Sequence, residues 1–171
     1  DSTDEGNIGP IADALCDGLQ ASGADVVDIG VAPTPLTYFA AHHLGTGSCV
    51  SVTGSHNPPE YNGLKMVVEG HTLSGDEIQD LRRRIDRQEY RAGSGRRSEA
   101  SVLEAYLARI AGDVKLARPM RIAVDCGNGV AGMAAPLLYR RLGCDVRELY
   151  CEVDGSFPNH EANPLDHETL A

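Results

Sequence analysis

The spacing of apolar residues along the chain alternates between a helical period and short continuous runs. Apolar residues from Ile11 to Leu19 recur every three or four positions, which predicts a helix that Gly23 ends. The next runs predict a strand, a helix and a second strand, at residues 25–29, 32–44 and 48–53. This alternation of helix and strand is typical of an α/β fold, in which helices cover a sheet.

The same alternation continues downstream. A short strand is predicted at residues 64–68, followed by a helix that Ser74 caps, with Glu77 at the capping-box position. We expect this helix to bury an apolar face formed by Ile78, Leu81 and Ile85. Beyond it the pattern predicts a helix, a strand, a second helix and a second strand, at residues 102–110, 121–126, 130–142 and 145–151. The last three elements form a βαβ unit.

The segment from Tyr90 to Ser98 is the best candidate for a domain boundary. It is polar, it contains two glycines, and its apolar residues show no periodicity. We therefore predict two domains, the first at residues 1–100 and the second at residues 101–171. The second is expected to be truncated at its C-terminal end and the first to be incomplete at its N-terminal end.

Composition and charge restrict the partners of the chain. The 171 residues are 42% hydrophobic and carry a net charge of −10, which disfavours binding to nucleic acid or to an anionic membrane. No apolar run approaches the length that spans a membrane, and no signal-peptide pattern is present. The five cysteines are odd in number and lack C-x-x-C spacing, which favours reduced thiols and a cytoplasmic protein.

The loop after the strand at residues 48–53 carries the densest group of reactive side chains. Ser55 and His56 are adjacent, Lys65 follows at the far end, and Pro58-Pro59 restricts the backbone between them. A rigid loop at the end of a buried strand commonly presents catalytic residues. An ordinary stiff hairpin loop has the same composition, so the residues alone leave both interpretations open.

The sequence of residues 53–65, T-G-S-H-N-P-P-E-Y-N-G-L-K, resembles the phosphoserine loop of the α-D-phosphohexomutases, of the phosphomannomutase/phosphoglucomutase type. The resemblance implies a three-layer α/β/α first domain followed by the beginning of a similar second domain. It also implies an enzyme that interconverts hexose 1-phosphate and hexose 6-phosphate, with mannose or glucose as the sugar. In this family a phosphoserine donates its phosphate, and a hexose 1,6-bisphosphate is the intermediate.

Carried over by position, the resemblance assigns three catalytic residues. Ser55 matches the phosphorylated serine, and its phosphate also provides one oxygen ligand to Mg²⁺. His56 and Lys65 match residues near that phosphate. The chain lacks the family's D-G-D-G-D-R, G-E-x-S-G and C-terminal basic loops, so the remaining metal ligands lie outside it. We therefore expect this chain alone to be inactive.

Two other interpretations remain. Gly127–Gly132 matches G-x-G-x-x-G between a strand and a helix, with Glu152 and Asp154 at the distance of a ribose-binding acid, which would indicate a dinucleotide-binding dehydrogenase domain. The resemblance instead assigns these glycines to a tight strand-to-helix turn, and the segment Asp154–Pro164 to a structural loop. The second of these interpretations is a noncatalytic fragment that keeps only the fold.

Overall fold

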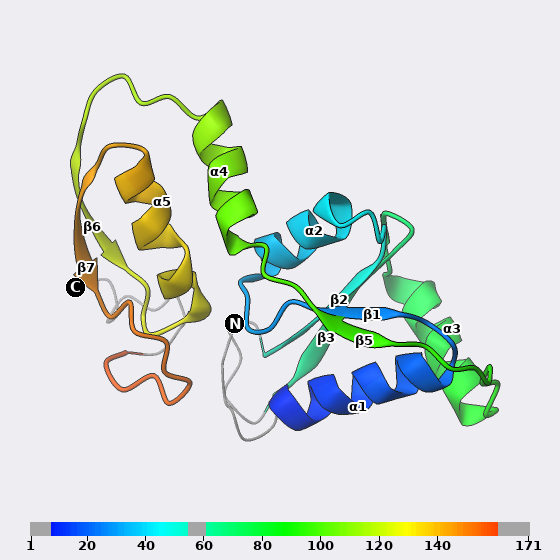
Figure 1. The fold of residues 1–171 in the computed structure, drawn as a ribbon. Helices are drawn as coiled ribbons and strands as arrows, with labels where there is room; N and C mark the ends of the chain where they lie inside the picture. Colours follow the sequence, from blue (N-terminus) through cyan, green and yellow to red (C-terminus); the bar gives the residue numbers. More distant parts are fainter. Residues whose placement is uncertain (1–7, 55–60, 161–171) are drawn as a thin grey trace.

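The computed structural model describes residues 8–54 and 61–160 of the chain (Figure 1). Its elements confirm the mixed α/β fold class. Helices and strands occur at almost all the predicted places, with small differences at their ends. In chain order they are α1 (Ile8–Ala21), β1 (Val26–Asp28), α2 (Thr34–His43), β2 (Cys49–Thr53), β3 (Gly63–Val68), β4 (His71–Thr72), α3 (Gly75–Asp86), β5 (Arg97–Glu99), α4 (Leu103–Asp113), β6 (Arg121–Asp125), the 3₁₀ helix η1 (Val130–Met133), α5 (Ala135–Arg141) and β7 (Asp145–Leu149).

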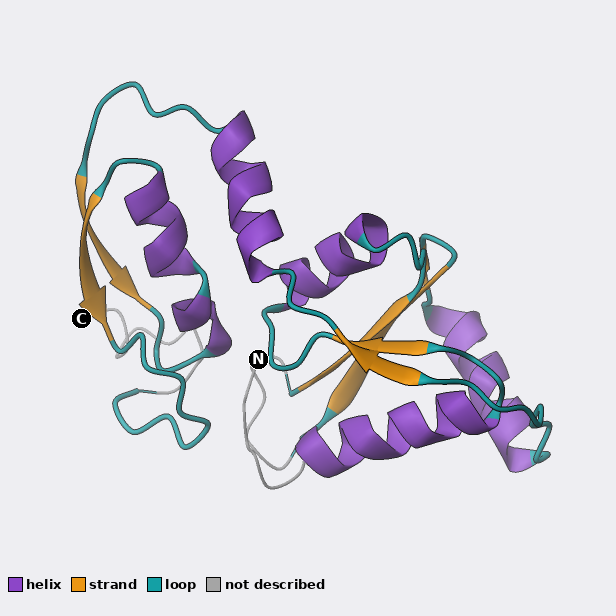
Figure 2. Ribbon diagram, viewed as in Figure 1, coloured by secondary structure: helices purple, strands orange, loops and turns teal. Residues whose placement is uncertain are grey.

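The described strands form three separate sheets (Figure 2). Strands β1 and β5 pair in parallel, and β2, β3 and β4 form an antiparallel sheet in that order. Strands β6 and β7 also pair in parallel, with η1 and α5 between them in the chain, so the predicted βαβ unit is confirmed.

Helices α1 and α2 lie on opposite sides of the strands in the first half of the chain (Figure 1). Both contact β2, and α2 also contacts α4. The buried centre of this contact is formed by Leu36 and Ala40 of α2 with Val102 at the start of α4. One turn into α4, Leu107 is only 2% exposed, so the helix predicted at residues 102–110 buries one of its apolar side chains.

Strand β5 begins inside the segment 90–98, for which the sequence predicted no strand, so that prediction was wrong for its last two residues. The two glycines of this segment are needed for close packing. A Cβ atom on Gly93 would lie 2.6 Å from the Cα of Gly23, and one on Gly95 would lie 1.9 Å from the carbonyl oxygen of Ala24. These close approaches place β5 beside β1. The domain boundary itself stays a prediction.

An ion pair of Arg97 also joins β5 to β1. Arg97 of β5 donates to Asp28 of β1 at 2.6 Å and to Asp13 of α1 at 2.8 Å. Its hydrogen bond, together with the backbone N–H of Gly30, lowers the pKa of the Asp28 carboxyl below its ordinary value. Asp28 is the more enclosed partner, since its side chain is 29% exposed and that of Asp13 is 63% exposed.

Helix α3 has the predicted capping box between Ser74 and Glu77, but its apolar face is not buried. Among its apolar residues, Ile78 is 38% exposed, Leu81 36% and Ile85 58%. The prediction of a buried face was therefore wrong. Helical periodicity shows which residues share a face, whereas burial depends on what packs against that face.

The predicted helix at residues 130–142 is interrupted. The chain forms η1, passes through Ala134, and then begins α5, in which Pro136 lies in the first turn. Proline has no N–H to donate to a preceding turn, so it is suited to the start of a helix and not to its middle.

The contact between Gly95 and Ala24 predicts a large and specific effect of one methyl group. We expect Gly95→Ala to lower the free energy of unfolding by about 2 kcal/mol or more, because the added Cβ meets backbone atoms that cannot rotate away. Gly112→Ala is the matched control: an added Cβ there meets nothing within 4 Å, and the residue lies in α4. This control is expected to gain about 0.5–1 kcal/mol. Urea denaturation followed by circular dichroism measures both, and equal effects would contradict the packing argument.

The pKa of Asp28 predicts a pH dependence of stability. A carboxyl whose folded pKa is depressed stabilises the fold above its ordinary pKa, and this stabilisation is lost as the pH falls through the depressed value. We expect Asp28→Asn to cost about 1–2 kcal/mol at pH 7 and progressively less below pH 4. Asp13→Asn, at the more exposed partner of Arg97, is expected to cost less than about 0.5 kcal/mol. A cost of Asp28→Asn that is independent of pH would refute this account.

Candidate functional site

The loop that joins β2 to β3 contains the predicted catalytic serine. Its two ends are adjacent, because Thr53 pairs with Gly63 in the antiparallel ladder. Ser55 and His56 lie outside the described residues. Lys65 is described: it lies in β3 opposite Ser51 of β2. Of the three predicted catalytic residues, the structure therefore locates only Lys65.

A buried polar surface separates α2 from this sheet. Thr34 and Thr37 of α2 and Ser51 and Thr53 of β2 are each at most 9% exposed. Because side chains alternate along a strand, Ser51 and Thr53 share one face of β2, and their partners in β3 share it with them. Lys65 lies on this face and donates from Nζ to the Thr34 hydroxyl at 3.3 Å. Polar side chains thus occupy the part of this face nearest the β2–β3 loop, where an α/β fold usually has apolar ones.

The ammonium of Lys65 lies at the N-terminal end of α2. Thr34, its partner, is the first residue of that helix, and Pro35 occupies the first turn. The N-terminal end of a helix carries a partial positive charge that adds to the charge of the lysine. In a chain with a net charge of −10, this arrangement gives one local positive region beside the β2–β3 loop. Such a region suits a phosphate group.

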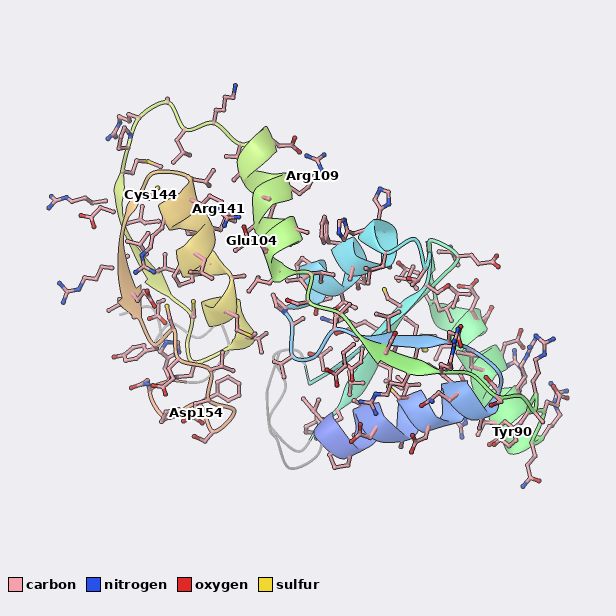
Figure 3. All side chains as sticks on the ribbon, in the orientation of Figure 1. Tyr90, Glu104, Arg109, Arg141, Cys144 and Asp154 are labelled. Atoms are coloured by element: carbon pink, nitrogen blue, oxygen red, sulfur yellow. The ribbon has the colours of Figure 1, made fainter. Side chains whose placement is uncertain are left out.

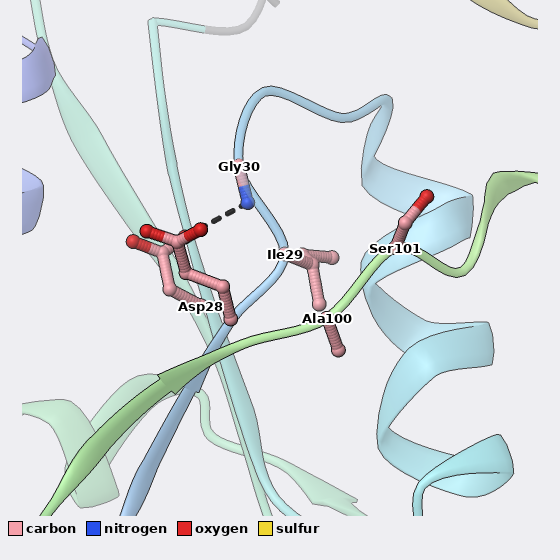
Figure 4. Close-up of a pocket in the computed structure, with 6 residues that line it drawn as sticks. Asp28, Ile29, Gly30, Ala100 and Ser101 are labelled. Carbon is pink, nitrogen blue, oxygen red and sulfur yellow. Dashed lines mark hydrogen bonds between the residues drawn. The ribbon is translucent and has the colours of Figure 1, made fainter.

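An open pocket lies at the carboxyl ends of the parallel strands β1 and β5 (Figure 4). It is lined by Asp28, Ile29, Gly30, Glu99, Ala100 and Ser101. The carboxylate of Asp28 accepts from the N–H of Gly30 at 2.8 Å and is paired with Arg97, as described above. Two carboxylates in its lining make this pocket unfavourable for a phosphate, so it is not the site that the β2–β3 loop serves.

Atoms of distant residues of the chain lie close to two glycines of the G-x-G-x-x-G match. A Cβ on Gly132 would lie 2.0 Å from the carbonyl oxygen of Cys151, and one on Gly127 would lie 2.7 Å from the ring of His160. These positions therefore serve a close turn between β6 and η1. This agrees with the strand-to-helix interpretation of the motif and leaves the dinucleotide interpretation without support from the geometry.

Asn128, inside that turn, is a buried residue that sequence reasoning did not single out. It is 5% exposed, and its side-chain amide donates to the carbonyl oxygen of Glu152 at 2.9 Å. Its side-chain oxygen accepts from Asn159 at 2.7 Å, and its backbone oxygen accepts from the N–H of Asp154 at 2.9 Å. Asn128 thus holds the described part of the segment after β7 against this turn.

The acids and histidines near this turn form ordinary local contacts. The carboxylate of Asp154 (labelled in Figure 3) accepts from the N–H and hydroxyl of Ser156, which lowers the pKa of that carboxyl. His160 contacts Asp125 at 3.1 Å. Within residues 8–54 and 61–160, no three His, Cys, Asp or Glu side chains are grouped as metal ligands. The described part of the chain also contains no helix of the length and hydrophobicity that crossing a bilayer requires.

Thr34 is the other residue that sequence reasoning missed as part of the site. It was interpreted only as the start of a helix. The available signal was the sequence Pro33-Thr34-Pro35, which places a hydroxyl between two prolines at a helix start. That signal gives no partner, because the partner Lys65 is distant in sequence.

Comparison with known proteins identifies the family to which the sequence of this chain is similar. Residues 9–92 match the phosphoglucomutase/phosphomannomutase alpha/beta/alpha domain I, and residues 104–171 match domain II of the same family. A phosphomannomutase/phosphoglucomutase of Pseudomonas aeruginosa is 49% identical over 156 residues, which are 91% of this chain and 34% of that protein. A phosphoglucomutase of Neisseria gonorrhoeae is 48% identical over 155 residues, again 34% of its length.

A solved structure gives the same result. The crystal structure of a phosphoglucomutase/phosphomannomutase family protein from Burkholderia thailandensis matches with a TM-score of 0.88 and 45% identity. The match covers 95% of this chain and 37% of that one. The chain therefore spans about a third of the length of the relatives it matches. Both its sequence and its fold show that the chain belongs to the phosphoglucomutase/phosphomannomutase family.

Proposed function

We propose that the chain supplies the phosphate-carrying part of a cytoplasmic phosphohexomutase. The complete enzyme interconverts hexose 1-phosphate and hexose 6-phosphate, with mannose or glucose as the sugar. Ser55 carries the phosphate, and a hexose 1,6-bisphosphate is the intermediate. Neither nucleic acid nor a membrane takes part.

The placement of Lys65 is the observation that supports this proposal most directly. Its ammonium, the Thr34 hydroxyl and the N-terminal end of α2 lie together, beside the strand that Gly54 and Ser55 follow. A phosphoryl group carries its negative charge on oxygen atoms, and phosphoryl transfer depends mainly on positioning and on stabilising that charge. The lysine and the helix end provide positive charge where the sequence places the serine.

The proposed reaction divides one transfer into two. In the first, the phosphate bonded to Ser55 Oγ moves to the free hydroxyl of the hexose phosphate, and the serine regains a proton. In the second, the bisphosphate returns its other phosphate to Ser55, which loses its proton, and the sugar oxygen released from that phosphate takes up a proton. We assign Lys65 and His56 to the neighbourhood of this phosphate, where a cationic or hydrogen-bonding group offsets its charge and assists proton transfer.

Mg²⁺ is the proposed cofactor, and the described residues alone do not form a site for it. Magnesium requires several oxygen ligands, and the described part of the chain groups no three carboxylate, histidine or cysteine side chains. The phosphate on Ser55 would give one ligand, and the others would come from outside this chain. The proposal therefore assigns no step of the reaction to the metal.

A chimera tests the proposed role of Ser55. The aligned third of the Pseudomonas aeruginosa relative is replaced by this chain, and conversion of mannose 1-phosphate to mannose 6-phosphate is measured. We expect the chimera to be active within about tenfold of its parent and Ser55→Ala to lose at least about 10³-fold in kcat, because the phosphate acceptor is removed. The isolated 171-residue chain is expected to show no turnover.

Ser51→Ala is the matched control, since Ser51 is a buried serine of the preceding strand. It is expected to keep most of the activity. An active Ser55→Ala chimera would show that another residue carries the phosphate. A correctly folded but inactive parent chimera would favour the noncatalytic interpretation of the chain.

The Thr34–Lys65 hydrogen bond predicts a second effect in the same chimera. We expect Thr34→Val to lower kcat about tenfold with little change in KM, because the ammonium loses the hydroxyl that positions it. Thr34→Ser keeps a hydroxyl and should restore most of the rate. If Thr34→Val and Thr34→Ser are equally impaired, the defect comes from packing of α2 and Thr34 does not position the lysine.

A further inference from the structure

Two cysteine side chains meet where β6 and β7 end. Cys126 directly follows β6, Cys151 lies two residues beyond β7, and the thiol of Cys151 donates to the sulfur of Cys126 at 3.3 Å. Both are partly exposed and neither is in a disulfide. The sulfur atoms of a disulfide are about 2.05 Å apart, so these two need to approach by about 1.3 Å. Small rotations of the two side chains can supply that movement.

The backbone around this pair is held firmly, so the closeness of the sulfurs is built into the fold. The N–H of Asn128 donates to the carbonyl oxygen of Tyr150 at 2.7 Å, and its side-chain amide donates to the carbonyl oxygen of Glu152 at 2.9 Å. These carbonyls lie on either side of Cys151. The carbonyl oxygen of Cys151 itself fills the space that a side chain on Gly132 would need.

We propose that Cys126 and Cys151 are a dithiol modification site, which a hydroperoxide oxidises to an intramolecular disulfide. In the first step the sulfur of one cysteine attacks a peroxide oxygen and the O–O bond breaks. This forms a sulfenic acid and releases water or an alcohol. In the second step the other sulfur attacks the sulfenic sulfur, the S–O bond breaks, and the departing hydroxide leaves as water with the remaining thiol proton. The two thiols lose two electrons and two protons, and the peroxide is reduced.

The surroundings of the pair determine the order of the two steps. Burial raises the pKa of the Cys126 thiol to about 12, and the neighbouring Cys151 thiol and the carboxylates of Asp125 and Glu148 act in the same direction. Cys126 therefore stays protonated at neutral pH. Since the thiolate is the nucleophile, the raised pKa disfavours Cys126 in the first attack, which is therefore assigned to Cys151, and Cys126 resolves the sulfenic acid.

The cross-link would join the carboxyl ends of two parallel strands. In open α/β sheets this edge is the usual place for a ligand, and here it carries the turn at 127–132 and the segment after β7. The disulfide would close a loop that contains η1, α5 and β7, which limits the freedom of the unfolded chain. Oxidation should therefore raise the thermal midpoint by several degrees. The inference does not depend on the proposed mutase activity.

Peptide mapping of the 171-residue chain tests the proposal. After treatment with hydrogen peroxide and alkylation of free thiols, trypsin separates Cys126, Cys144 and Cys151 into the peptides 122–140, 142–147 and 148–171, while Cys16 and Cys49 remain together in 1–65. We expect 122–140 linked to 148–171, lighter by two hydrogens than the two free peptides together. Dithiothreitol should release both.

Variants of the same chain test the order of the steps. Cys126→Ser should leave a sulfenic acid on Cys151 that dimedone traps, and Cys49→Ser, in the sheet of β2, should form the link as the parent does. Circular dichroism confirms that each variant is folded. If the parent chain oxidises Cys151 to a sulfinic acid without forming the link, the proposal is wrong. It is also wrong if Cys126 and Cys151 are both fully alkylated after peroxide has oxidised Cys49.

Discussion

The parallel pairing of β1 with β5 is the contact on which the arrangement of the first half of the chain depends. It joins residues near 26 to residues near 97, and it requires Gly93 and Gly95 to approach the end of α1 more closely than any side chain allows. Because β5 leads directly into α4, the pairing also brings Val102 against α2 and completes the buried centre there. Helix α4 in turn meets α5, where Glu104 and Arg141 pair at 2.7 Å (Figure 3). The strand pair thus positions α4, and α4 contacts α5 in the second half of the chain.

The features that could be predicted from the sequence are those that depend on neighbouring residues. Periodicity and end signals located almost every helix and strand, and the capping box of Ser74 was predicted correctly. The errors arose where a distant segment decides. Strand β5 exists because of its contact with β1, and its polar sequence Arg-Ser-Glu gives no strand signal. The exposed face of α3 likewise depends on what packs against it. The break before Pro136 is the exception, because its cause is local: proline has no N–H to donate, which apolar periodicity does not represent.

The candidate site divides in the same way. The sequence of the β2–β3 loop indicated the family, because many fixed residue types occur in a fixed order. It gave no indication that the start of α2 belongs to the site, since Thr34 and Lys65 are distant in the chain and meet only in three dimensions. The buried polar surface between α2 and β2, formed by three threonines and Ser51, also depends on contacts between segments that are distant in the chain. Ser55 and His56 remain assignments made by sequence, because they lie outside the described residues.

Asn128 has a consequence for how such chains can be recombined. Its hydrogen bonds reach Tyr150, Glu152, Asp154 and Asn159, so the turn after β6 and the segment after β7 recognise each other atom by atom. A crossover between two relatives placed inside residues 129–149 would combine a turn from one parent with a segment fitted to the other. A crossover in the connection between α4 and β6, at residues 114–120, would leave this set of contacts intact. The turn and the segment after β7 should therefore come from the same parent in a recombinant, although more than twenty residues separate them.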